Sequence, residues 1–520
     1  MQVVQSVSQS ALAAAPAVEL IGIDKRFGAV RANRDVSLTI ARGSVHGIVG
    51  ENGAGKSTLM SILYGYYQAD AGEIRVDGRP RQIRSAHDAI AAGIGMVHQH
   101  FMLVDDFTVL ENVMLGIEGN ALLGPAAATA RAALAELSAA YGLEIDPDAV
   151  IRDLPVGLQQ RVEILKALHR GADILILDEP TAVLTPQEVD QLFRMLRRFR
   201  DQGKTVILIT HKLREIMAVT DRVTVMRGGA VVDTVDTAAT SREQLAEMMV
   251  GRKVLLRVEK PPAAVGAAVL EVANLTVVDG AGVARVKDVG FTVRAGEIVG
   301  VAGVSGNGQS ELLEALAGMR PFAGEVRVNG KPVTVEQGWA LARALRRRRV
   351  SHVPEDRQRE GLVGAFAANE SAILGYQDDP ACNGLILMDR RKIVARCAKE
   401  MQSFDVRPTD PALRTAAFSG GNQQKIVLAR ELERDPVLLL VGQPTRGVDI
   451  GAIEFIHRRL LEMRAAGKAI LLVSVELDEI LALADRILVM FDGRIVGELP
   501  RAEATEAKLG LLMAGVEGQA

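Results

Sequence analysis

The chain has 520 residues, a formal net charge of −3 and 48% hydrophobic residues. Its length predicts two or more domains, because a single hydrophobic core stops growing at about 250–300 residues. The nearly balanced charge argues against nucleic acid as the main partner, since binding to a phosphate backbone usually needs a strongly basic surface.

No apolar run in the sequence approaches the roughly 20 residues that a membrane-spanning helix needs. Residues 1–17 lack the basic and long apolar regions of a signal peptide, so we expect a disordered leader there. The two cysteines, Cys382 and Cys397, are too few for a disulfide framework and are expected to be buried free thiols in a reducing compartment. These features predict a soluble chain that takes any membrane role through a partner.

A glycine-rich segment follows the first strongly apolar strand pattern. GENGAGKST comes after VHGIV and opens a helix pattern, which is the context of a phosphate-binding P-loop. Its glycines let backbone N–H groups surround phosphate oxygens, and the helix N-terminus favours an anion. We expect Lys56 to reach the outer phosphates of ATP and Ser57 to ligate Mg²⁺. The residues predicted to bind ATP here are Gly50, Glu51, Asn52, Gly53, Ala54, Gly55, Lys56, Ser57 and Thr58.

Phe27, upstream of this loop in KRFGAV, is a candidate for stacking on adenine. The alternative is an ordinary aromatic residue of the core. Further along, Gln99 in MVHQHF is a candidate contact of Mg²⁺ or of water, although a solitary glutamine carries little information.

An acidic pair ends the apolar strand pattern ILILD. Asp178 is predicted to hold Mg²⁺ through water, and Glu179 to act as the general base on the attacking water. His211, after a later strand pattern, is predicted to bridge the γ-phosphate and Glu179. Each residue alone has an ordinary structural alternative, but their order after Lys56 favours ATP hydrolysis.

Residues 106–157 include an Ala-rich helical pattern, which predicts a helical subdomain. Elsewhere apolar β-branched runs precede glycine turns and amphipathic helix patterns. This alternation of strand, turn and helix predicts α/β domains with largely parallel sheets.

The second half of the chain repeats the first. DVSLTIARGSVHGIVGENGAGKSTL at 35–59 is similar to DVGFTVRAGEIVGVAGVSGNGQSEL at 288–312, and later motifs recur in the same order. Ordered similarity of this kind predicts duplicated domains. The predicted organisation is a leader at 1–17, a first domain at 18–252, a linker at 253–266 and a second domain at 267–515.

The order of these motifs resembles the nucleotide-binding domain of ABC transporters, and FSGGNQQK at 418–425 matches the ABC signature. The resemblance covers roughly residues 18–515. It implies two tandem P-loop ABC ATPase domains, each with a mostly parallel sheet and a helical subdomain. DEPTAVLTPQE and QPTRGVDIGA are similar to segments of the ATPase subunits of prokaryotic simple-sugar importers. The long segment PVGLQQRVEILKALHRGADILILDEPTAVLTPQE resembles their purine-nucleoside branch.

This resemblance also implies partners and shared sites. Each ATP is expected to lie between the P-loop of one half and the signature of the other, with Asp449 reporting across the interface. The expected partners are two integral-membrane permease subunits at the cytoplasmic face of the membrane and, indirectly, an extracytoplasmic substrate-binding protein. The signature residues expected to complete the first site are Ser419, Gly420, Gly421 and Asn422.

The second site has lost residues that hydrolysis needs. Gln309 replaces the P-loop lysine, and Gly442 and Gln443 replace the acidic pair. We expect this site not to hydrolyse ATP, and either to bind nucleotide or only to support the fold. The positions that define it, with those of the altered signature LPVGLQQ, are Gln309, Ser310, Gly442, Gln443, Val475, Pro155 and Gly157.

The predicted function is therefore ATP hydrolysis that energises an importer, with nucleosides as first choice of cargo and ribose- or galactose-type monosaccharides as second. A soluble tandem ABC protein acting on ribosomes or DNA is the rival, and the short linker, the altered site and the acidic charge argue against it. A nucleotide sensor without turnover is opposed by Glu179 and His211. The arginine run at 346–349 is expected to be a solvated helix face, and Glu355 is expected in a loop that approaches the permease.

Overall fold

The computed structural model of the chain forms two compact units, Met1–Val254 and Leu255–Ala520. The residues that it describes are 15–28, 30–98, 101–116, 123–181, 184, 186–253, 260–262, 264–304, 306–333, 339–383, 387–448 and 450–515. Of the leader predicted for 1–17, residues 1–14 lie outside the described residues. Ala17, however, is buried, and its N–H donates to the Ile40 carbonyl oxygen at 2.9 Å, so the ordered domain begins slightly earlier than predicted.

Two sheets form the core of the first unit. Their strands are β1 (Val18–Phe27), β2 (Val30–Ile40), β3 (Val45–Gly50), β4 (Ala71–Val76), β5 (Arg79–Arg81), β6 (Ile94–Val97), β7 (Ile174–Asp178), β8 (Thr205–Ile209), β9 (Arg222–Arg227) and β10 (Ala230–Asp236). Among the described residues, one sheet has the order β2-β1-β4-β5 and the other has the order β10-β9-β3-β8-β7-β6. The first sheet is antiparallel, and the second is parallel except for the edge strand β10.

The helices of the first unit follow the predicted alternation with strands. They are α2 (Lys56–Leu63), α3 (Ala86–Ala91), α4 (Val109–Met114), α5 (Leu123–Tyr141), α6 (Val156–His169), α7 (Pro186–Asp201), α8 (Leu213–Val219) and α9 (Arg242–Val250). The helices α4 and α5, with the start of α6, form the helical subdomain that the Ala-rich pattern predicts.

The second unit repeats this arrangement of two sheets. Its strands are β11 (Ala268–Val278), β12 (Ala284–Arg294), β13 (Ile298–Ala302), β14 (Ala323–Val328), β15 (Lys331–Pro332), β16 (Val350–Val353), β17 (Leu438–Gly442), β18 (Ala469–Val473), β19 (Arg486–Phe491) and β20 (Arg494–Pro500). The described strands form an antiparallel sheet of order β12-β11-β14-β15 and a largely parallel sheet of order β16-β17-β18-β13-β19-β20.

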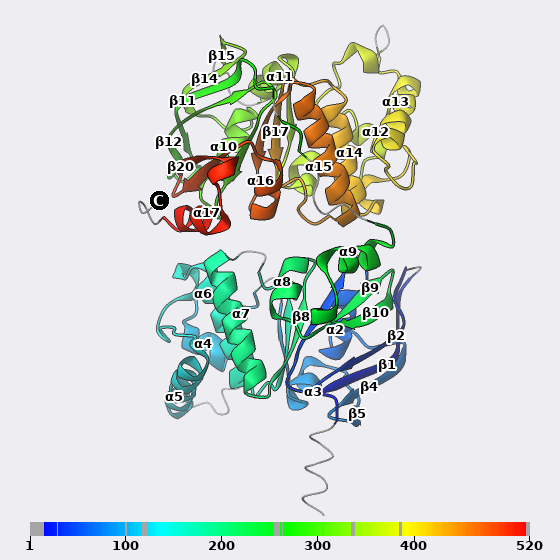
Figure 1. Ribbon diagram of the computed structural model, residues 1–520, viewed down its shortest axis with the longest axis vertical. Helices are drawn as coiled ribbons and strands as arrows, with labels where there is room; N and C mark the ends of the chain where they lie inside the picture. The colour runs from blue at the N-terminus through cyan, green and yellow to red at the C-terminus, as the bar shows by residue number, and fades with distance from the viewer. Residues whose placement is uncertain are drawn as a thin grey trace, which may run out of the picture. The chain divides into compact units, whose positions relative to one another are not determined.

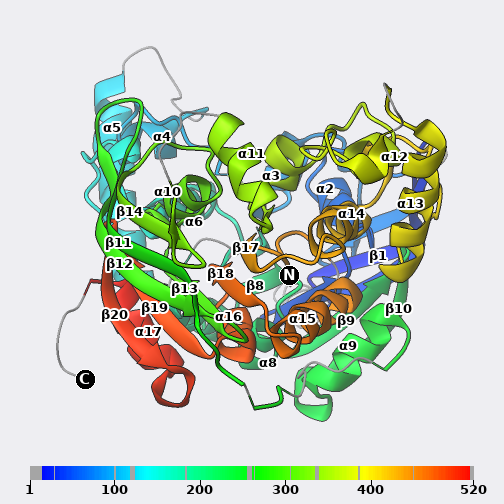
Figure 2. The ribbon, with the colours of Figure 1, turned by 90° about the horizontal axis from the view of Figure 1, so that it is seen from above.

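The helices of the second unit follow the same order along the chain, with one additional π-helix after β16. They are α10 (Gln309–Leu316), α11 (Trp339–Arg347), the π-helix η3 (Arg357–Gly361), α12 (Ala368–Ser371), α13 (Arg390–Ser403), α14 (Gly420–Leu432), α15 (Ile450–Ala465), α16 (Leu477–Leu483) and α17 (Glu506–Met513). Within each unit, the antiparallel sheet and the helical subdomain lie on opposite sides of the parallel sheet (Figures 1 and 2).

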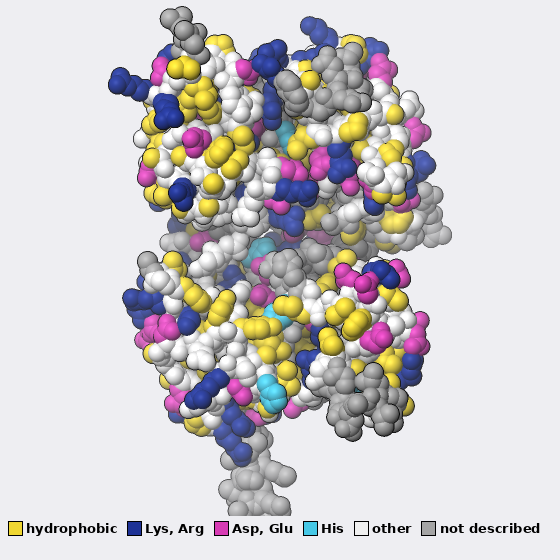
Figure 3. Space-filling view, turned by 180° about the vertical axis from the view of Figure 1, so that it is seen from behind, with side chains coloured by type: hydrophobic (Ala, Val, Ile, Leu, Met, Phe, Trp, Pro, Cys, Tyr) yellow, Lys and Arg dark blue, Asp and Glu magenta, His cyan; other side chains and the backbone are white. Residues whose placement is uncertain are grey.

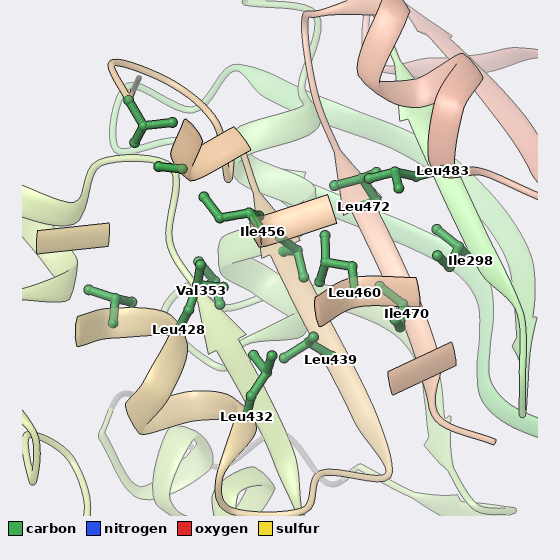
Figure 4. Packing of buried hydrophobic residues seen from close by; sticks show 14 of the residues in the cluster. Ile298, Val353, Leu428, Leu432, Leu439, Ile456, Leu460, Ile470, Leu472 and Leu483 are labelled. Carbon is green, nitrogen blue, oxygen red and sulfur yellow. The ribbon is translucent and has the colours of Figure 1, made fainter. Parts of the chain in front are cut away.

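The parallel strands are continuous apolar runs because both faces of the sheet are covered. Every residue of β7, β8, β17 and β18 is buried. In the second unit, Leu439 and Leu472 of the sheet pack with Leu432 of α14 and with Ile456 and Leu460 of α15 (Figure 4). This packing holds the ends of the parallel strands in fixed positions, and the candidate site residues follow these ends.

The α/β prediction with parallel sheets and helical subdomains is confirmed, but the sequence analysis did not predict the antiparallel sheets. Cys382 and Cys397 are buried free thiols, as predicted. Acidic and basic side chains are interspersed on the surface in view in Figure 3, in keeping with the nearly balanced charge. Within the described part of the chain, no helix has the length and apolar character needed to cross a bilayer.

Candidate active site

The loop between β3 and α2 in the first unit has the backbone of a phosphate cradle. Gly53 and Gly55 have φ angles of 82° and 96°, a region that glycine enters without steric cost. A Cβ on Gly55 would lie 2.3 Å from the Ala32 carbonyl oxygen, so no other residue fits there without a shift of the backbone. The turn therefore leaves the loop amides and the start of α2 available to an anion.

Lys56 lies at the first position of α2 with only 6% of its surface exposed. Its Nζ donates to the carbonyl oxygens of Gly50 at 2.7 Å and Glu51 at 3.0 Å. Burial lowers the pKa of Lys56, and the charges of Glu179 and Asp178 oppose this effect. A phosphate in the loop would give the ammonium a charged acceptor, which binds more strongly than a carbonyl oxygen.

Asp178 ends β7 beside the first turn of α2. Burial raises its pKa, while a hydrogen bond from the Ser57 hydroxyl and the charge of Lys56 act in the opposite direction. A serine hydroxyl and a carboxylate are oxygen ligands of the kind that Mg²⁺ prefers, so this pair fits the ion. Gln99, the third predicted ligand, lies outside the described residues.

Glu179 and His211 form the polar pair next to Asp178. His211 Nδ1 and Glu179 Oε1 are 2.8 Å apart. Burial acts to raise the pKa of Glu179, but the hydrogen bond to His211 and the charges of His211, Lys56 and Lys212 outweigh it and lower that pKa. The carboxylate is therefore ionised at neutral pH and can accept a proton, as a general base must.

The backbone of Glu179 is strained. Its φ angle is 47°, and its N–H donates to the Ile209 carbonyl oxygen at 2.9 Å. Gln443, the equivalent residue of the second unit, has a φ angle of 44° and donates to Val473 at 2.8 Å. Such conformations cost about 1–3 kcal/mol and need support from the surrounding structure. The second unit thus keeps the geometry of this position without its carboxylate.

Phe27 is 43% exposed, so the alternative of a core aromatic is wrong. Its ring packs edge-to-face on Tyr67, with the ring centroids 5.1 Å apart, and the Lys25 ammonium lies 5.4 Å from its centroid. An exposed aromatic face is what adenine stacking requires, and this role of Phe27 stays a prediction.

The signature of the second unit begins α14. Ser419 is its N-cap, and the Ser419 hydroxyl oxygen accepts a hydrogen bond from Asn422 Nδ2 at 2.9 Å. Asn422 Oδ1 in turn accepts the N–H of Arg407 at 2.9 Å. These contacts orient the serine at a helix N-terminus, where an anion is favoured. Asp449 lies outside the described residues.

Arg357, a further residue near the signature, was not predicted from the sequence. Its Nη1 donates to the Arg446 carbonyl oxygen at 2.7 Å and its Nη2 to the Gly447 carbonyl oxygen at 3.4 Å. A Cβ on Gly420 would lie 2.6 Å from Arg357 Nη2. The guanidinium therefore lies directly against the signature turn, between it and the segment after β17.

The first unit lacks this arginine and the matching glycine. The residues at the equivalent positions are Phe101 and Val156, and Val156 is 43% exposed. A large residue is thus present at the signature turn only where no guanidinium occupies the space. An alignment of the two halves of the sequence shows both differences, Phe101 against Arg357 and Val156 against Gly420, and could have suggested that Arg357 and Gly420 are in contact.

The signature equivalent of the first unit begins α6 at Pro155. Pro155 has φ −53° and ψ 150°, close to the −61° and 157° of Ser419, but it makes no side-chain cap. The turn is therefore kept while the hydroxyl and one N–H are lost. A Cβ on Gly157 would lie 2.1 Å from Glu188 Oε1, so a larger residue there would displace the Glu188 side chain.

The glycine loop of the second unit keeps its backbone and changes its side chains. Gly306 and Gly308 have φ angles of 92° and 97°, nearly those of the first loop. Gln309 Nε2 donates to the Val304 carbonyl oxygen at 3.2 Å, as Lys56 does to the equivalent Glu51. Gln443 Oε1 accepts the N–H of Val475 at 3.2 Å, in place of the imidazole contact of the first unit.

Glu355 lies two residues after β16, in the loop that is predicted to approach the permease, and its side chain makes a contact within the second unit. Its Oε2 accepts the Ser310 hydroxyl at 2.6 Å, so the carboxylate points to the second glycine loop. A Cβ on Gly442 would lie 2.6 Å from Glu355 Cγ and 2.5 Å from Leu313 Cδ2. Glu355 therefore fills the space that a side chain at position 442 would occupy.

Gly442→Asp is expected to destabilise the second unit although it restores the aspartate found in the first. The new side chain would overlap Leu313 and bring a second carboxylate against Glu355, and overpacking typically costs about 1–3 kcal/mol. Calorimetry should show a lower unfolding temperature. The double variant Gly442→Asp/Glu355→Ala should recover part of the loss, and a stable single variant would contradict the packing described here.

The arginine run at 346–349 lies at the surface, as predicted, with Arg347 and Arg349 exposed, and its side chains also contact neighbouring segments. Arg346 lies over the Tyr376 ring, 5.4 Å from its centroid. Arg347 forms an ion pair with Asp378, and Arg349 forms one with Asp435. The run is thus bound to neighbouring segments of the second unit.

The fold and the first glycine loop with its carboxylates define a P-loop ATPase. Residues 33–182 and 286–446 match the family described as ABC transporter, and the chain belongs to this family. It is an ATPase that hydrolyses ATP to drive transport through an importer, which confirms the prediction over the ribosome- or DNA-acting alternative.

Relatives that match nearly the whole chain include proteins named for nucleoside, guanosine and glucose import. The nucleoside import ATP-binding protein NupA of Lactococcus lactis is 47% identical over 96% of this chain and 98% of its own length. The guanosine import ATP-binding protein NupO of Bacillus subtilis is 47% identical over 96% and 97%. The glucose import ATP-binding protein TsgD13 of Haloferax volcanii is 46% identical over 96% of both chains.

Proposed function

We propose that this importer ATPase energises the uptake of nucleosides and hydrolyses ATP at the glycine loop of its first unit. The contact of 2.8 Å between His211 and Glu179 carries the catalytic part of the proposal, because it holds an ionised carboxylate beside the loop. The similarity to proteins named for nucleoside and guanosine import supports the choice of cargo.

The residues of the first unit divide the catalytic work. Lys56 and the loop amides bind the phosphates, and Ser57 and Asp178 hold Mg²⁺, which supplies positive charge to the phosphate oxygens when it is bound. Glu179 accepts the proton of the attacking water at its carboxylate, and His211 keeps that carboxylate in place. Gln99 is a further candidate ligand, and Phe27 is proposed to stack on adenine.

The second unit contributes its signature and does not hydrolyse ATP. Ser419 and Asn422, with Gly420 and Gly421, are proposed to complete the hydrolysing site. Gln443 has an amide where Glu179 has a carboxylate, so no base is present at that position. ATP can drive the conformational change only through its different affinity for the two states.

The proposed partners are two integral-membrane permease subunits, with the chain bound at the cytoplasmic face of the membrane as a peripheral subunit. An extracytoplasmic substrate-binding protein would deliver the cargo to the permease. The ATPase therefore does not select the cargo, and the cargo has to be tested on the whole transporter.

We expect the transporter, co-purified with its permease and reconstituted in vesicles with its binding protein, to accumulate radiolabelled guanosine when ATP is supplied to this subunit. Uptake should be lost in Glu179→Gln and retained in a Glu370→Gln control, which alters a carboxylate that caps α12. Excess unlabelled adenosine should compete, and excess ribose or glucose should not.

A monosaccharide is the second candidate cargo, because a relative named for glucose import is 46% identical over the same length. Competition by glucose or ribose without competition by nucleosides would reverse the order of the two candidates. ATP-dependent uptake of neither class would contradict the proposed cargo while leaving ATP hydrolysis as a separate result.

A further inference from the structure

A cavity of about 320 Å³ lies in the first unit between the end of α5 and the helices α6 and α7, on the side of the helical subdomain (Figure 1). Small-molecule sites have volumes of about 300–1,000 Å³, so the cavity is large enough for a ligand. Its walls combine apolar side chains, among them Leu192 and Met195, with the guanidinium groups of Arg161, Arg194 and Arg198. No residue of the glycine loop lines it, so it is separate from the candidate active site.

In the second unit an aromatic ring fills the equivalent place. The helices α7 and α15 both have 16 residues, and Phe455 of α15 stands at the position of Gln191 in α7. The Phe455 ring packs on Phe404, with the two centroids 5.6 Å apart. Lys425 and Arg458 lie 5.2 Å and 6.0 Å from the centroid of Phe455. Because the face of an aromatic ring attracts cations, the ring and these two side chains stabilise one another.

A carboxylate accompanies this ring in the second unit. The Lys425 ammonium donates to the backbone carbonyl oxygen of Asp405 at 2.9 Å and to its carboxylate at 3.5 Å. The equivalent residue of the first unit is Gly142, and the two residues share a positive φ angle, 49° and 68°. A Cβ on Gly142 would lie 2.6 Å from Arg198 Nη1. The first unit therefore has a guanidinium in the space where the second unit has a carboxylate side chain.

The first unit has thus lost the ring and the carboxylate and has kept the cations. Arg161 and Arg194 stand at the positions of Lys425 and Arg458, and Arg198 is a further cation of the same cavity. Within the part of the chain that the structure describes, Arg194 and Arg198 make no hydrogen bond or ion pair. Two guanidinium groups at the cavity are therefore available to a ligand.

Two carboxylates also belong to the walls of the cavity. Glu188 Oε1 lies 2.1 Å from where a Cβ on Gly157 would be, so this carboxylate lies against the start of α6. Glu144 is exposed in the segment after α5. Arg161 donates to the side-chain oxygen of Gln191. Three guanidinium groups against two carboxylates leave one excess positive charge, so the cavity favours an anion.

We propose that this cavity binds an aromatic monophosphate, a planar ring that carries a phosphate group as in a nucleoside monophosphate. The ring takes the place that Phe455 has in the second unit, on the apolar wall and next to a guanidinium, which stacks well on a nucleic-acid base. The phosphate takes the role of Asp405 as the anion, and Arg194 and Arg198 offer it the paired donors that suit phosphate oxygens. This inference goes beyond the proposed function, because the cavity contains none of the groups that hydrolyse ATP.

The test is equilibrium binding of a fluorescent analogue of guanosine monophosphate to the full chain. Mg²⁺ and a saturating non-hydrolysable ATP analogue are present, so that the ATP sites are occupied, and we expect the probe still to bind. Unlabelled guanosine monophosphate should compete with it. Guanosine lacks the phosphate and inorganic phosphate lacks the ring, so each should need a concentration at least about tenfold higher to compete.

Gln191→Phe gives α7 the residue of α15 and fills the cavity. We expect it to weaken binding of the probe by at least about tenfold without lowering the unfolding temperature. Asp190→Phe is the matched control, since it adds a ring at an exposed position of the same helix that does not line the cavity, and it should keep the wild-type affinity.

Arg198→Gln removes a guanidinium without filling the cavity, and it decides the matter if Gln191→Phe does not fold. The loss of a charge-assisted hydrogen bond should weaken binding of the probe by about tenfold. Arg197→Gln is its control, because Arg197 is the neighbouring exposed arginine, lies outside the cavity and donates to the Ala218 carbonyl oxygen at 2.8 Å. This control should bind the probe as the wild type does.

Complete displacement of the probe by the ATP analogue would overturn the inference, because the probe would then bind only at the ATP sites. Wild-type affinity in Gln191→Phe or in Arg198→Gln would also overturn it. So would competition by guanosine or by inorganic phosphate as strong as that by guanosine monophosphate. None of these outcomes touches ATP hydrolysis or nucleoside uptake, which are measured separately, so a failure here is distinguishable from a failure of the proposed function.

Discussion

Glu179→Gln is expected to lower the steady-state rate of ATP hydrolysis by about 10²–10⁴-fold, the usual contribution of a positioned proton acceptor. Glutamine has nearly the same shape, and its amide oxygen can still contact His211, which lies 2.8 Å from the present carboxylate. The variant therefore loses basicity while the surroundings of Lys56 and Asp178 stay as they are. Phosphate release from the assembled transporter measures the rate, and binding of a fluorescent ATP analogue should persist.

The second unit offers a matched control for this prediction. Gln443 has the same strained φ angle and the same backbone hydrogen bond as Glu179, but no carboxylate. Gln443→Asn should keep ATP hydrolysis within about twofold of the wild type, because asparagine tolerates a positive φ angle. Equal loss of activity in Glu179→Gln and Gln443→Asn would contradict the division of labour between the two units.

Much of the first site could be predicted because its signals are local in the sequence. The glycine spacing before Lys56 and the apolar strand that ends in Asp178 each need only a few consecutive residues. Parallel strands then bring their carboxyl ends to one edge of a sheet, so His211 after β8 meets Glu179 after β7. The order of motifs was therefore enough to expect a common site.

The second unit was less predictable because the residues that replace the first site's groups belong to no recognisable local motif, and their contacts join distant segments. Ser310 and Glu355 are 45 residues apart, and Arg357 and Arg446 are 89 residues apart. Their contacts depend on which strands are neighbours, and the order β16-β17-β18-β13 is not visible in any local pattern. The antiparallel sheets were missed for a similar reason, because β11 pairs with both β12 and β14, and β14 lies beyond the intervening strand β13 and helix α10.

Arg357→Ala is expected to lower the maximal rate of ATP hydrolysis by about tenfold to 10²-fold, because small displacements of groups that position a substrate have effects of this size. The guanidinium donates to the carbonyl oxygens of Arg446 and Gly447 and leaves no room for a side chain on Gly420. Without it, the signature turn loses its neighbour on one side. Under the proposal that the signature turn completes the hydrolysing site, Arg357 acts through this turn as a positioning residue.

Two comparisons separate positioning from a general loss of stability. Arg359→Ala removes an exposed arginine from the same π-helix and should leave the rate within about twofold, since a surface substitution usually has little effect. Arg357→Lys keeps the charge but cannot reproduce the fork of two donors, so its rate should stay closer to that of Arg357→Ala than to the wild type.

Azido-ATP labelling of the first unit should be unchanged in Arg357→Ala, because Lys56 and its loop are intact. A normal rate of ATP hydrolysis in Arg357→Ala would contradict this role. A fall in labelling equal to the fall in rate would also contradict it, because the loss of hydrolysis would then come from weaker nucleotide binding and not from the geometry of the turn.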